Sequence, residues 1–530
     1  MTRAAQLTLE LPPDGSGDAP ATLPRMDLAG DWKTQPRSWP HALHPMCTYL
    51  GSLPAALAHD LIARWSRPGD VVLDPFCGRG TVPLQASLER RIGVGIDRNP
   101  LAQLLTAAAL EPPSRRDALT RVELLRIQWS ETRDEWRAMA HEMAGTGGAG
   151  TGGAATFFHP ETLAQLLLAR AELGRSRAGR HDPVDRFLLA ALAGVLHGRR
   201  AAALTDAMPN TFSMPPGYAA RWLAARDAVR GSGRPERALF AVLARRVTWL
   251  LREGRPGSRG IAIPGDAREA GALTAAALRE RGLPERLRLV VTSPPYLGLV
   301  RYGSANWLRL WLLGEDAAHV DSLLDTPGSV DRSSVLMRQV LDDIRPILAD
   351  DAVVVLVMGD IEADRGRRRR RPVDLAAATW ESAAAPAGYR LVGVSSDAID
   401  PTRKLTRLWG VRAGGAARTD RLLVIAPTEL GRRRALATAG IPVDWTRTAG
   451  LHPAAAVRPA PAPISRSAAA MPPRPAGSRP AILGSHAADV PPGRPGIDGP
   501  ARPDEEPGPR TDDRPTPELH PATAGAPLPA

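Results

Sequence analysis

The chain has 530 residues, which is more than one ordinary compact domain needs and enough to bury a large core. No stretch approaches the continuous apolar length of a membrane-crossing helix, and the polar start lacks the apolar segment of a secretory signal. Cys47 and Cys77 are the only cysteines, which excludes a disulfide framework and a thiolate zinc cage. We therefore expect a cytoplasmic protein that holds no metal and does not contact a membrane.

The formal net charge is +12 and the isoelectric point is about 10.7. A basic balance favours a polyanionic partner, because phosphate binding releases condensed counterions. Lysine occurs only at Lys33 and Lys404, so nearly all of the positive charge is arginine. A coding bias toward arginine would give the same composition. The charge therefore favours a nucleic-acid partner only modestly.

Residues 1–38 are polar and Pro-rich, and we expect them to form a flexible arm. From Trp39 to about residue 430, short apolar runs alternate with amphipathic stretches, which is typical of a sheet covered by helices. We therefore predict one α/β domain over residues 39–430. The expected strands are 71–73, 93–96, 287–292, 352–358, 389–394 and 421–425. The expected helices are 53–65, 81–90, 118–143, 161–173 and 184–196.

Two regions depart from this alternation. Residues 112–255 contain almost only helical patterns, interrupted by a Gly/Thr/Ala-rich linker. We expect a mostly helical insert there, and an insert of this length is usually functional. Residues 431–530 are rich in Pro, Ala, Arg and Gly, and cannot bury enough apolar surface to offset the entropy of ordering. We expect a disordered C-terminal tail.

A strand-to-helix turn at residues 74–81 carries the first chemical signal. Gly78 and Gly80 let the backbone turn sharply and approach a ligand, and the helix that follows offers free N–H groups. Asp97 ends the next expected strand, where a carboxylate can accept hydrogen bonds from both hydroxyls of a ribose. The turn lacks the third glycine of the dinucleotide-binding fingerprint, which disfavours a site for NAD. It also lacks the lysine of a P-loop, which disfavours a site for nucleoside triphosphates.

The strand expected at 287–292 runs into Ser293-Pro294-Pro295-Tyr296. Two prolines stiffen the backbone and remove two N–H donors, so the carbonyl groups point outward. Acceptors at Ser293 and Pro294 would bind a nucleobase amine, favour its rehybridisation toward sp³ and aim its lone pair at an electrophilic methyl group. Tyr296 would stack on a base that has left the duplex. A strand-ending turn is the alternative for Pro-Pro-Tyr taken alone.

Both motifs resemble those of the DNA amino-methyltransferases, which use S-adenosylmethionine. The resemblance covers residues 39–427 and implies a Rossmann-like class I methyltransferase sheet. It implies that Asp74 faces the methionine ammonium of the cofactor, above Gly78 and Gly80. It also implies that Asp266 reads the adenine amine, for which an ordinary Gly-Asp turn is the alternative. Residues 41–51 are similar to the segment that closes over the methionine end.

The resemblance supplies the full set of candidate site residues. The candidate cofactor-binding residues are Asp74, Pro75, Phe76, Gly78, Gly80, Thr81, Asp97 and Asp266. The candidate catalytic residues are Ser293, Pro294, Pro295 and Tyr296. The order of the motifs matches the permutation class whose insert reads the target sequence, so residues 112–255 are the candidate target-recognition region.

Serine at position 293 resembles the cytosine-N4 subgroup, whereas adenine-N6 enzymes mostly have Asp or Asn there. Cytosine N4 is therefore the favoured target, and adenine N6 is retained. Cytosine C5 is disfavoured because its nucleophile is typically in a Pro-Cys pair, which this chain lacks. The expected partner is duplex DNA with a flipped target base, and a restriction nuclease is a candidate second partner.

Three other readings remain. RNA guanine-N2 methyltransferases share a similar cofactor loop and Pro-Pro-Tyr motif, but typically begin with an RNA-binding domain that this Pro-rich start is not expected to form. A catalytically silent nucleic-acid-binding scaffold would not require these motifs to be intact. A small-molecule N-methyltransferase is a more distant alternative. Detectable binding of the cofactor would separate the enzymes from the scaffold.

Overall fold

The computed structural model of the chain describes residues 23–28, 32, 35, 40–146, 153–175, 182–198, 202–208, 215–258, 260–295, 297, 301–359, 374–398 and 419–443. Among these residues, no helix combines the length and the apolar character needed to cross a membrane. The arginine run at 365–371 and residues 444–530 of the expected tail lie outside the described residues.

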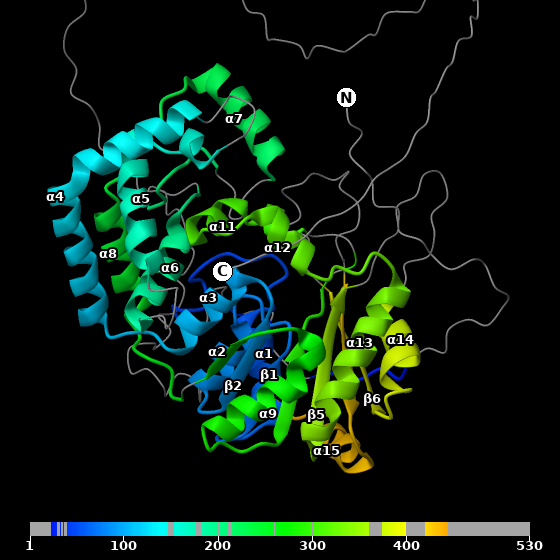
Figure 1. Cartoon of the computed structure of the whole chain (residues 1–530). Coiled ribbons are helices and arrows are strands. Elements are labelled where there is room, and N and C mark those ends of the chain that lie inside the picture. Colours follow the sequence, from blue (N-terminus) through cyan, green and yellow to red (C-terminus); the bar gives the residue numbers. More distant parts are fainter. Residues whose placement is uncertain are drawn as a thin grey trace, which may run out of the picture. The chain divides into compact units, whose positions relative to one another are not determined.

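Seven strands of the described chain form one sheet in the order β3-β2-β1-β4-β5-β7-β6 (Figure 1). Strands β1 to β5 pair in parallel, whereas β7 runs antiparallel to β5 and to β6. The chain order reverses between β1 and β4, and in such doubly wound sheets ligands bind beyond the carboxyl ends of the strands at this point. An antiparallel β7 between β5 and β6 makes this the class I methyltransferase sheet, as predicted. The strands are β1 (Val71–Asp74), β2 (Ile92–Asp97), β3 (Ile261–Pro264), β4 (Leu287–Thr292), β5 (Leu348–Gly359), β6 (Arg390–Ala398) and β7 (Thr419–Ala426).

Helices cover both faces of the sheet because its strands are apolar on both sides. Side chains alternate along a strand, so Val71 and Leu73 share one core cluster with Leu341 of α13, while Val72 shares another with Leu61 of α1. The helices near the sheet are α1 (Ala55–Trp65), α2 (Thr81–Leu88), α3 (Pro100–Leu110), α9 (Ala270–Glu280), α13 (Val330–Ile344), α14 (Leu375–Thr379) and α15 (Glu429–Ala439). Three short helices follow β4, namely α10 (Tyr302–Ala305), α11 (Trp307–Leu313) and α12 (Ala317–Leu323).

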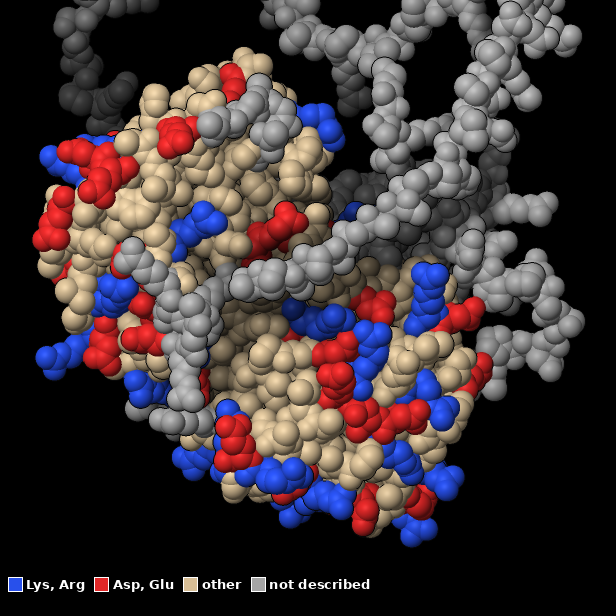
Figure 2. All heavy atoms as spheres, viewed as in Figure 1, with Lys and Arg blue, Asp and Glu red and all other residues tan. Residues whose placement is uncertain are grey.

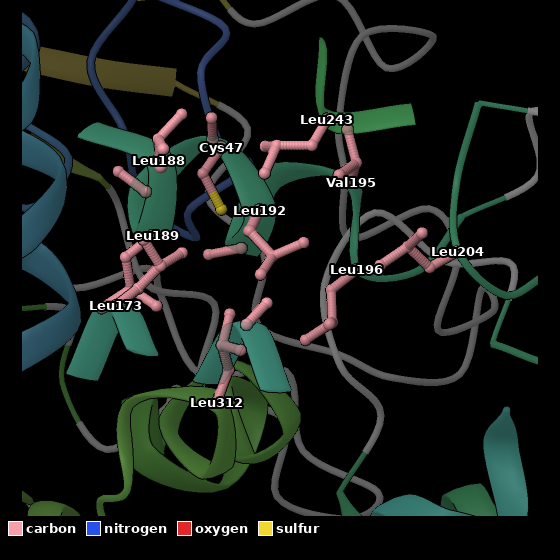
Figure 3. Packing of buried hydrophobic residues seen from close by; sticks show 14 of the residues in the cluster. Cys47, Leu173, Leu188, Leu189, Leu192, Val195, Leu196, Leu204, Leu243 and Leu312 are labelled. Atoms are coloured by element: carbon pink, nitrogen blue, oxygen red, sulfur yellow. The ribbon is translucent and has the colours of Figure 1, made fainter. Parts of the chain in front are cut away.

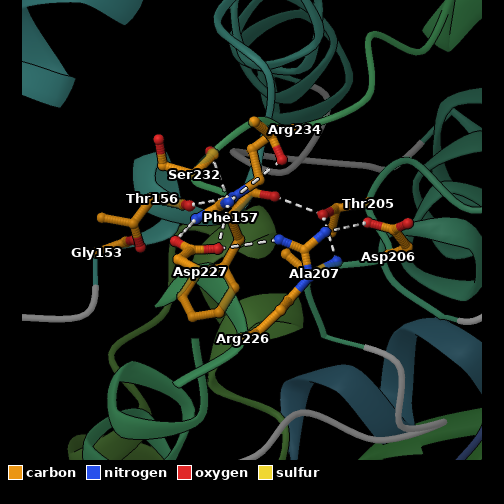
Figure 4. A network of polar contacts seen from close by, with 11 residues as sticks. Gly153, Thr156, Phe157, Thr205, Asp206, Ala207, Arg226, Asp227, Ser232 and Arg234 are labelled. Carbon is orange, nitrogen blue, oxygen red and sulfur yellow. Dashed lines mark hydrogen bonds and ion pairs between the residues drawn. The ribbon is translucent and has the colours of Figure 1, made fainter. Parts of the chain in front are cut away.

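The expected insert between β2 and β3 is mostly helical, as predicted. We call α4 to α8 the helical segment. Its leucines and alanines form a core that continues onto α3 and α11, part of which is shown in Figure 3. A polar network at one end links Arg234 to Asp227 at 2.8 Å and Arg226 to Asp206 at 3.3 Å (Figure 4). The helices are α4 (Arg115–Thr146), α5 (Pro160–Arg175), α6 (Pro183–Val195), α7 (Pro216–Arg230) and α8 (Leu239–Leu250).

Three differences from the expected elements have physical reasons. Strand β3 was not expected, because it has four residues and ends in proline. Residues 23–28 fall within the expected flexible arm, yet Met26 N–H donates to the Val394 carbonyl and Val394 N–H donates to the Pro24 carbonyl, each at 2.9 Å. This arm pairs with β6 because β6 is an edge strand with unpaired backbone groups.

The third difference concerns the start of the expected tail at residue 431, which lies inside α15. Arg64 of α1 donates hydrogen bonds to the carbonyls of Thr438, Ala439 and Ile441. These contacts satisfy carbonyl groups at the end of α15, and buried Ala435 packs in the same cluster as α1. The contacts with α1 therefore stabilise α15, although the composition after residue 431 is unfavourable for an ordered structure.

Candidate active site

A pocket lies at the carboxyl ends of β1, β2, β3 and β4, at the switch point of the sheet. The expected site residues that line it are Asp74, Pro75, Phe76, Gly78, Thr81, Asp97, Asp266, Ser293 and Pro295. Gly80 and Pro294 are buried and do not line it. Tyr296 lies outside the described residues. The structure therefore brings the glycine loop and the Ser-Pro-Pro motif together, although they are far apart in the sequence.

The glycine loop has the backbone conformation that its glycines allow. Gly78 has φ +52° and Gly80 has φ +80°, in the region that other residues rarely adopt. A Cβ on Gly80 would lie 2.7 Å from Thr106 Oγ1, so the close approach of α3 also requires glycine. The Gly78 N–H donates to Asp97 Oδ2 at 2.9 Å. The loop is thus fixed against the end of β2 and faces the pocket.

Two carboxylates of the pocket have raised pKa values, those of the buried Asp74 and the half-buried Asp97. Burial raises the pKa of Asp74 to about 7, although hydrogen bonds from Thr292 and from the Phe76 N–H oppose this shift. Burial also raises the pKa of Asp97 to about 6, against backbone hydrogen bonds led by that from Asn99. A buried anion is costly without a positive or hydrogen-bonding partner. These carboxylates are consequently suited to a ligand that carries an ammonium group and hydroxyls.

Strand β4 joins the two motifs directly. Thr292 Oγ1 donates to Asp74 Oδ1 at 2.7 Å, across the pairing of β1 with β4. The next residue, Ser293, has a buried hydroxyl oxygen without a hydrogen-bond partner among the described residues. Native proteins rarely leave such a group unpaired. The Ser293 hydroxyl therefore has hydrogen-bonding capacity left for a molecule in the pocket.

Asp266 lies at the pocket rim within a cluster of charges. Its Oδ1 accepts hydrogen bonds from Arg268 N and Nε, and its Oδ2 accepts from Arg268 Nη2 and from Arg98 Nη1. Burial acts to raise the pKa of Asp266, but the hydrogen bonds from Arg268 outweigh it and lower the pKa. Both carboxylate oxygens are engaged, so an adenine amine would compete here with an arginine.

Several pocket residues were not assigned from the sequence. Tyr49 and Tyr302 both line the pocket, and their rings stack with centroids 5.8 Å apart. Asn99 Nδ2 donates to the Tyr49 hydroxyl at 2.9 Å. The resemblance of residues 41–51 to a cofactor-closing segment was the only sequence signal for this wall.

Residues 32–106 match the model of a family described as DNA methylase, the N6/N4 methyltransferases. The chain is similar to the amino-methyltransferase family. The matched residues include β1, β2 and the glycine loop, and they end before β4. Together with the sheet order, the match supports methyltransferase activity.

Comparisons with other proteins add little to the amino-methyltransferase match. The rRNA methyltransferase AviRa from Streptomyces viridochromogenes, in a structure at 1.5 Å, is 14% identical with a TM-score of 0.25, covering 75% of this chain and 92% of that chain. A second AviRa structure at 2.4 Å is 13% identical with a TM-score of 0.25, covering 74% and 91%. These low scores carry no argument about fold or substrate. No curated protein matches the chain.

Amino-methyltransferases of this kind normally use S-adenosylmethionine, and the pocket fits such a ligand on three observations. The glycine loop allows close backbone approach. Among the described residues, the carboxylates of Asp74 and Asp97 lack a cationic side chain as hydrogen-bond partner, and the Ser293 hydroxyl is unpaired. The residues that would hold the cofactor are therefore the 74–81 loop and Asp97.

Proposed function

We propose that the chain transfers a methyl group from S-adenosylmethionine to an exocyclic amine of a DNA base, with cytosine N4 the favoured target. The observation that carries the proposal is the position of Ser293. Ser293 lines the same pocket as Asp74 and Asp97, and its buried hydroxyl oxygen has no hydrogen-bond partner among the described residues. A polar acceptor beside a site for a cationic cofactor is what amine methylation requires.

The pocket residues would divide the binding of the cofactor among them. Asp74 would attract the methionine ammonium, and Asp97 would accept from the ribose hydroxyls. The two carboxylates would each gain a partner that compensates for their burial. When bound, S-adenosylmethionine supplies an electrophilic methyl group on its sulfonium.

Ser293 and the prolines would act on the amine of the base. A base amine is a weak nucleophile because its lone pair is delocalised into the ring. The Ser293 hydroxyl would accept a hydrogen bond from one amine hydrogen, which favours rehybridisation and orients the lone pair. Pro294 and Pro295 carry no N–H group that could compete for that acceptor. Orientation would supply much of the acceleration.

Serine at position 293 favours cytosine, and the helical segment is the proposed target-recognition region. On the face shown in Figure 2, acidic and basic side chains are interspersed over both the sheet and the helical segment. The net charge therefore does not gather into a single basic patch on this face. Adenine N6 and RNA guanine N2 remain the alternative targets, and a restriction nuclease remains a candidate partner.

The test is methyl transfer from labelled S-adenosylmethionine to unmethylated genomic DNA and, in parallel, to total RNA, followed by nucleoside mass spectrometry. N4-methylcytosine in the DNA digest is the expected product. N6-methyladenine would preserve the mechanism and change the base. Label in RNA alone would overturn the assignment to DNA, and label in neither, with no binding of the cofactor, would overturn the proposal.

A further inference from the structure

One wall of the pocket belongs to a segment whose other end is held by the helical segment. We call residues 41–53 the strap. Residues 49–53 of the strap line the pocket. Residues 41–47 are mostly buried and lie against the helical segment, with hydrogen-bond partners up to 211 positions further along the chain.

Two charged side chains from the C-terminal end of α8 and the turn after it bind the strap backbone. Arg246 Nη2 donates to the carbonyls of Pro45 and Met46, at 2.6 and 2.9 Å. Glu253 Oε2 accepts from the Ala42 N–H at 2.5 Å, and it lies 3.9 Å from His41 Nδ1. The strap backbone is therefore held at two points by hydrogen bonds to charged groups, which are stronger than those between neutral groups.

Helix α6 closes the remaining space behind the strap. A Cβ built on Gly194 would lie 1.9 Å from the Met46 carbonyl oxygen, so only glycine fits there. Cys47 is buried in the same cluster as Leu188 and Leu192 of α6 and Leu243 of α8 (Figure 3). A strap packed this closely cannot shift without the helical segment.

The strap is also attached to helices that lie beside the sheet and the pocket. His44 Nε2 and Gln85 Oε1 of α2 form a buried hydrogen bond of 2.8 Å. Tyr49 accepts a hydrogen bond from Asn99 and stacks on Tyr302. Packed contacts therefore run without a break from α8 to the wall of the pocket.

We infer that Arg246 and Glu253 are positioning residues for the pocket, and that through the strap they set its affinity for the cofactor. The inference rests on the proposed function only for the identity of the ligand. Neither residue lines the pocket, and both bind the backbone of the strap, which does line it. A merely structural role in the helical segment would lower global stability without a selective effect on residues 41–53.

The test uses the full chain with Arg246→Met, Arg246→Lys and, as a matched control, Arg245→Met, whose side chain is exposed next to Arg246. Amide hydrogen exchange reports local opening of the strap, and calorimetry with S-adenosylmethionine reports affinity. In Arg246→Met we expect exchange in residues 41–47 to accelerate about tenfold, with β1 and β4 unchanged, and the Kd to rise about tenfold, because the charge-assisted hydrogen bonds to Pro45 and Met46 are lost. Arg246→Lys should retain most of the wild-type protection of residues 41–47 and most of the affinity for the cofactor.

Glu253 gives an independent pair of variants. Glu253→Gln keeps an acceptor for the Ala42 N–H, whereas Glu253→Ala removes it. The alanine variant should therefore accelerate exchange in the strap more than the glutamine variant does. Equal acceleration throughout the chain, or no change in the strap for both Arg246→Met and Glu253→Ala, would overturn the inference.

The outcomes also separate the inference from the proposed function. Wild-type protein that does not bind S-adenosylmethionine, while the strap still responds to Arg246→Met, would overturn the proposed function alone. Tight cofactor binding that Arg246→Met leaves unchanged would overturn the inference alone.

Discussion

Asp74 and Asp97 of the pocket and Asp227 of the helical segment are all partly or fully buried, yet their pKa values move in opposite directions. Burial raises the pKa of Asp74 and of Asp97. The hydrogen bond from Arg234 lowers the pKa of Asp227 despite some burial. A buried carboxylate without a cationic partner opposes folding, whereas one that is paired with a cation does so less or supports it. This contrast supports the proposal that the pocket carboxylates bind a ligand, whereas Asp227 holds the helical segment together.

The largest expected effect is a loss of catalytic rate on substitution of Ser293 in the pocket. Ser293→Ala should lower kcat by about 100-fold, the usual order for losing one preorganised hydrogen bond at the reacting group. Cofactor Kd should stay within about twofold, because Ser293 bonds no other described residue that shapes the pocket. Single-turnover methyl transfer and calorimetry measure the two quantities. Ser322→Ala, an exposed helical serine, is the control, and an equal loss of both quantities would remove Ser293 from its proposed role.

The next effect contrasts the two regions directly. Asp97→Ala should raise the cofactor Kd by about 30-fold, as expected for loss of hydrogen bonds to a charged group. Asp227→Ala should leave that Kd unchanged, because Asp227 bonds only to arginines of the helical segment. Calorimetric titration of both variants checks the contrast. Comparable losses in the two variants would show that the pocket carboxylates are not specialised for the ligand.

The pH dependence tests the sign of the pocket shifts. Asp74 must be charged to attract an ammonium, so cofactor affinity should fall by about tenfold per pH unit below pH 7. Its folded pKa is raised, so its stabilising contribution is present below pH 3.8, its ordinary pKa, and is lost as the pH rises through about 7. Asp74→Asn should therefore weaken cofactor binding at pH 8 while raising the thermal midpoint there, and leave the midpoint at pH 4 nearly unchanged. A lowered midpoint at pH 8 would contradict the shift.

The smallest effect belongs to the helical segment. Asp227→Asn should lower the free energy of unfolding by about 0.5 kcal/mol at pH 7, because partly exposed ion pairs contribute little. The folded pKa of Asp227 is lowered, so this contribution exists above pH 3.8 and is lost as the pH falls through the folded value. Urea denaturation at pH 7 and at a series of values below pH 3.8 measures it. A penalty that does not shrink as the pH falls below 3.8 would assign the effect to packing.

Sequence reasoning was most successful where one short segment carries the signal. The strand at 287–292 was predicted with its observed bounds, and the glycine loop was placed correctly between β1 and α2. The wall formed by Tyr49 and Tyr302 was missed because it is assembled from distant segments whose aromatic residues also suit a core. Arg246 was missed because a helical arginine is usually solvated. Its backbone partners are visible only once α8 meets the strap.

The same reason limits what the sequence says about the helical segment. Periodicity predicts α4, α5 and α6, since leucine and alanine recur on buried faces, whereas α7 and α8 were not among the expected helices. Periodicity does not predict which helix lies against residues 41–47, because the apolar faces of different helices have similar sequence patterns. The specific signal is Gly194, whose requirement for glycine depends on the Met46 carbonyl. A glycine inside a helix does not reveal its neighbour.

The pairing of β1 with β4 has a consequence for the synthesis of the protein. Asp74 and its hydrogen-bond partner Thr292 are 218 positions apart. A ribosome adds about 5–20 residues per second, so one edge of β1 stays open for roughly 10–40 s of translation before β4 emerges. An unpaired apolar strand edge is a site for chaperones and for aggregation. Chains truncated before β4 would therefore expose an edge of β1 to chaperones. The pocket can be completed only after the helical segment has been synthesised, because β4 follows it in the chain.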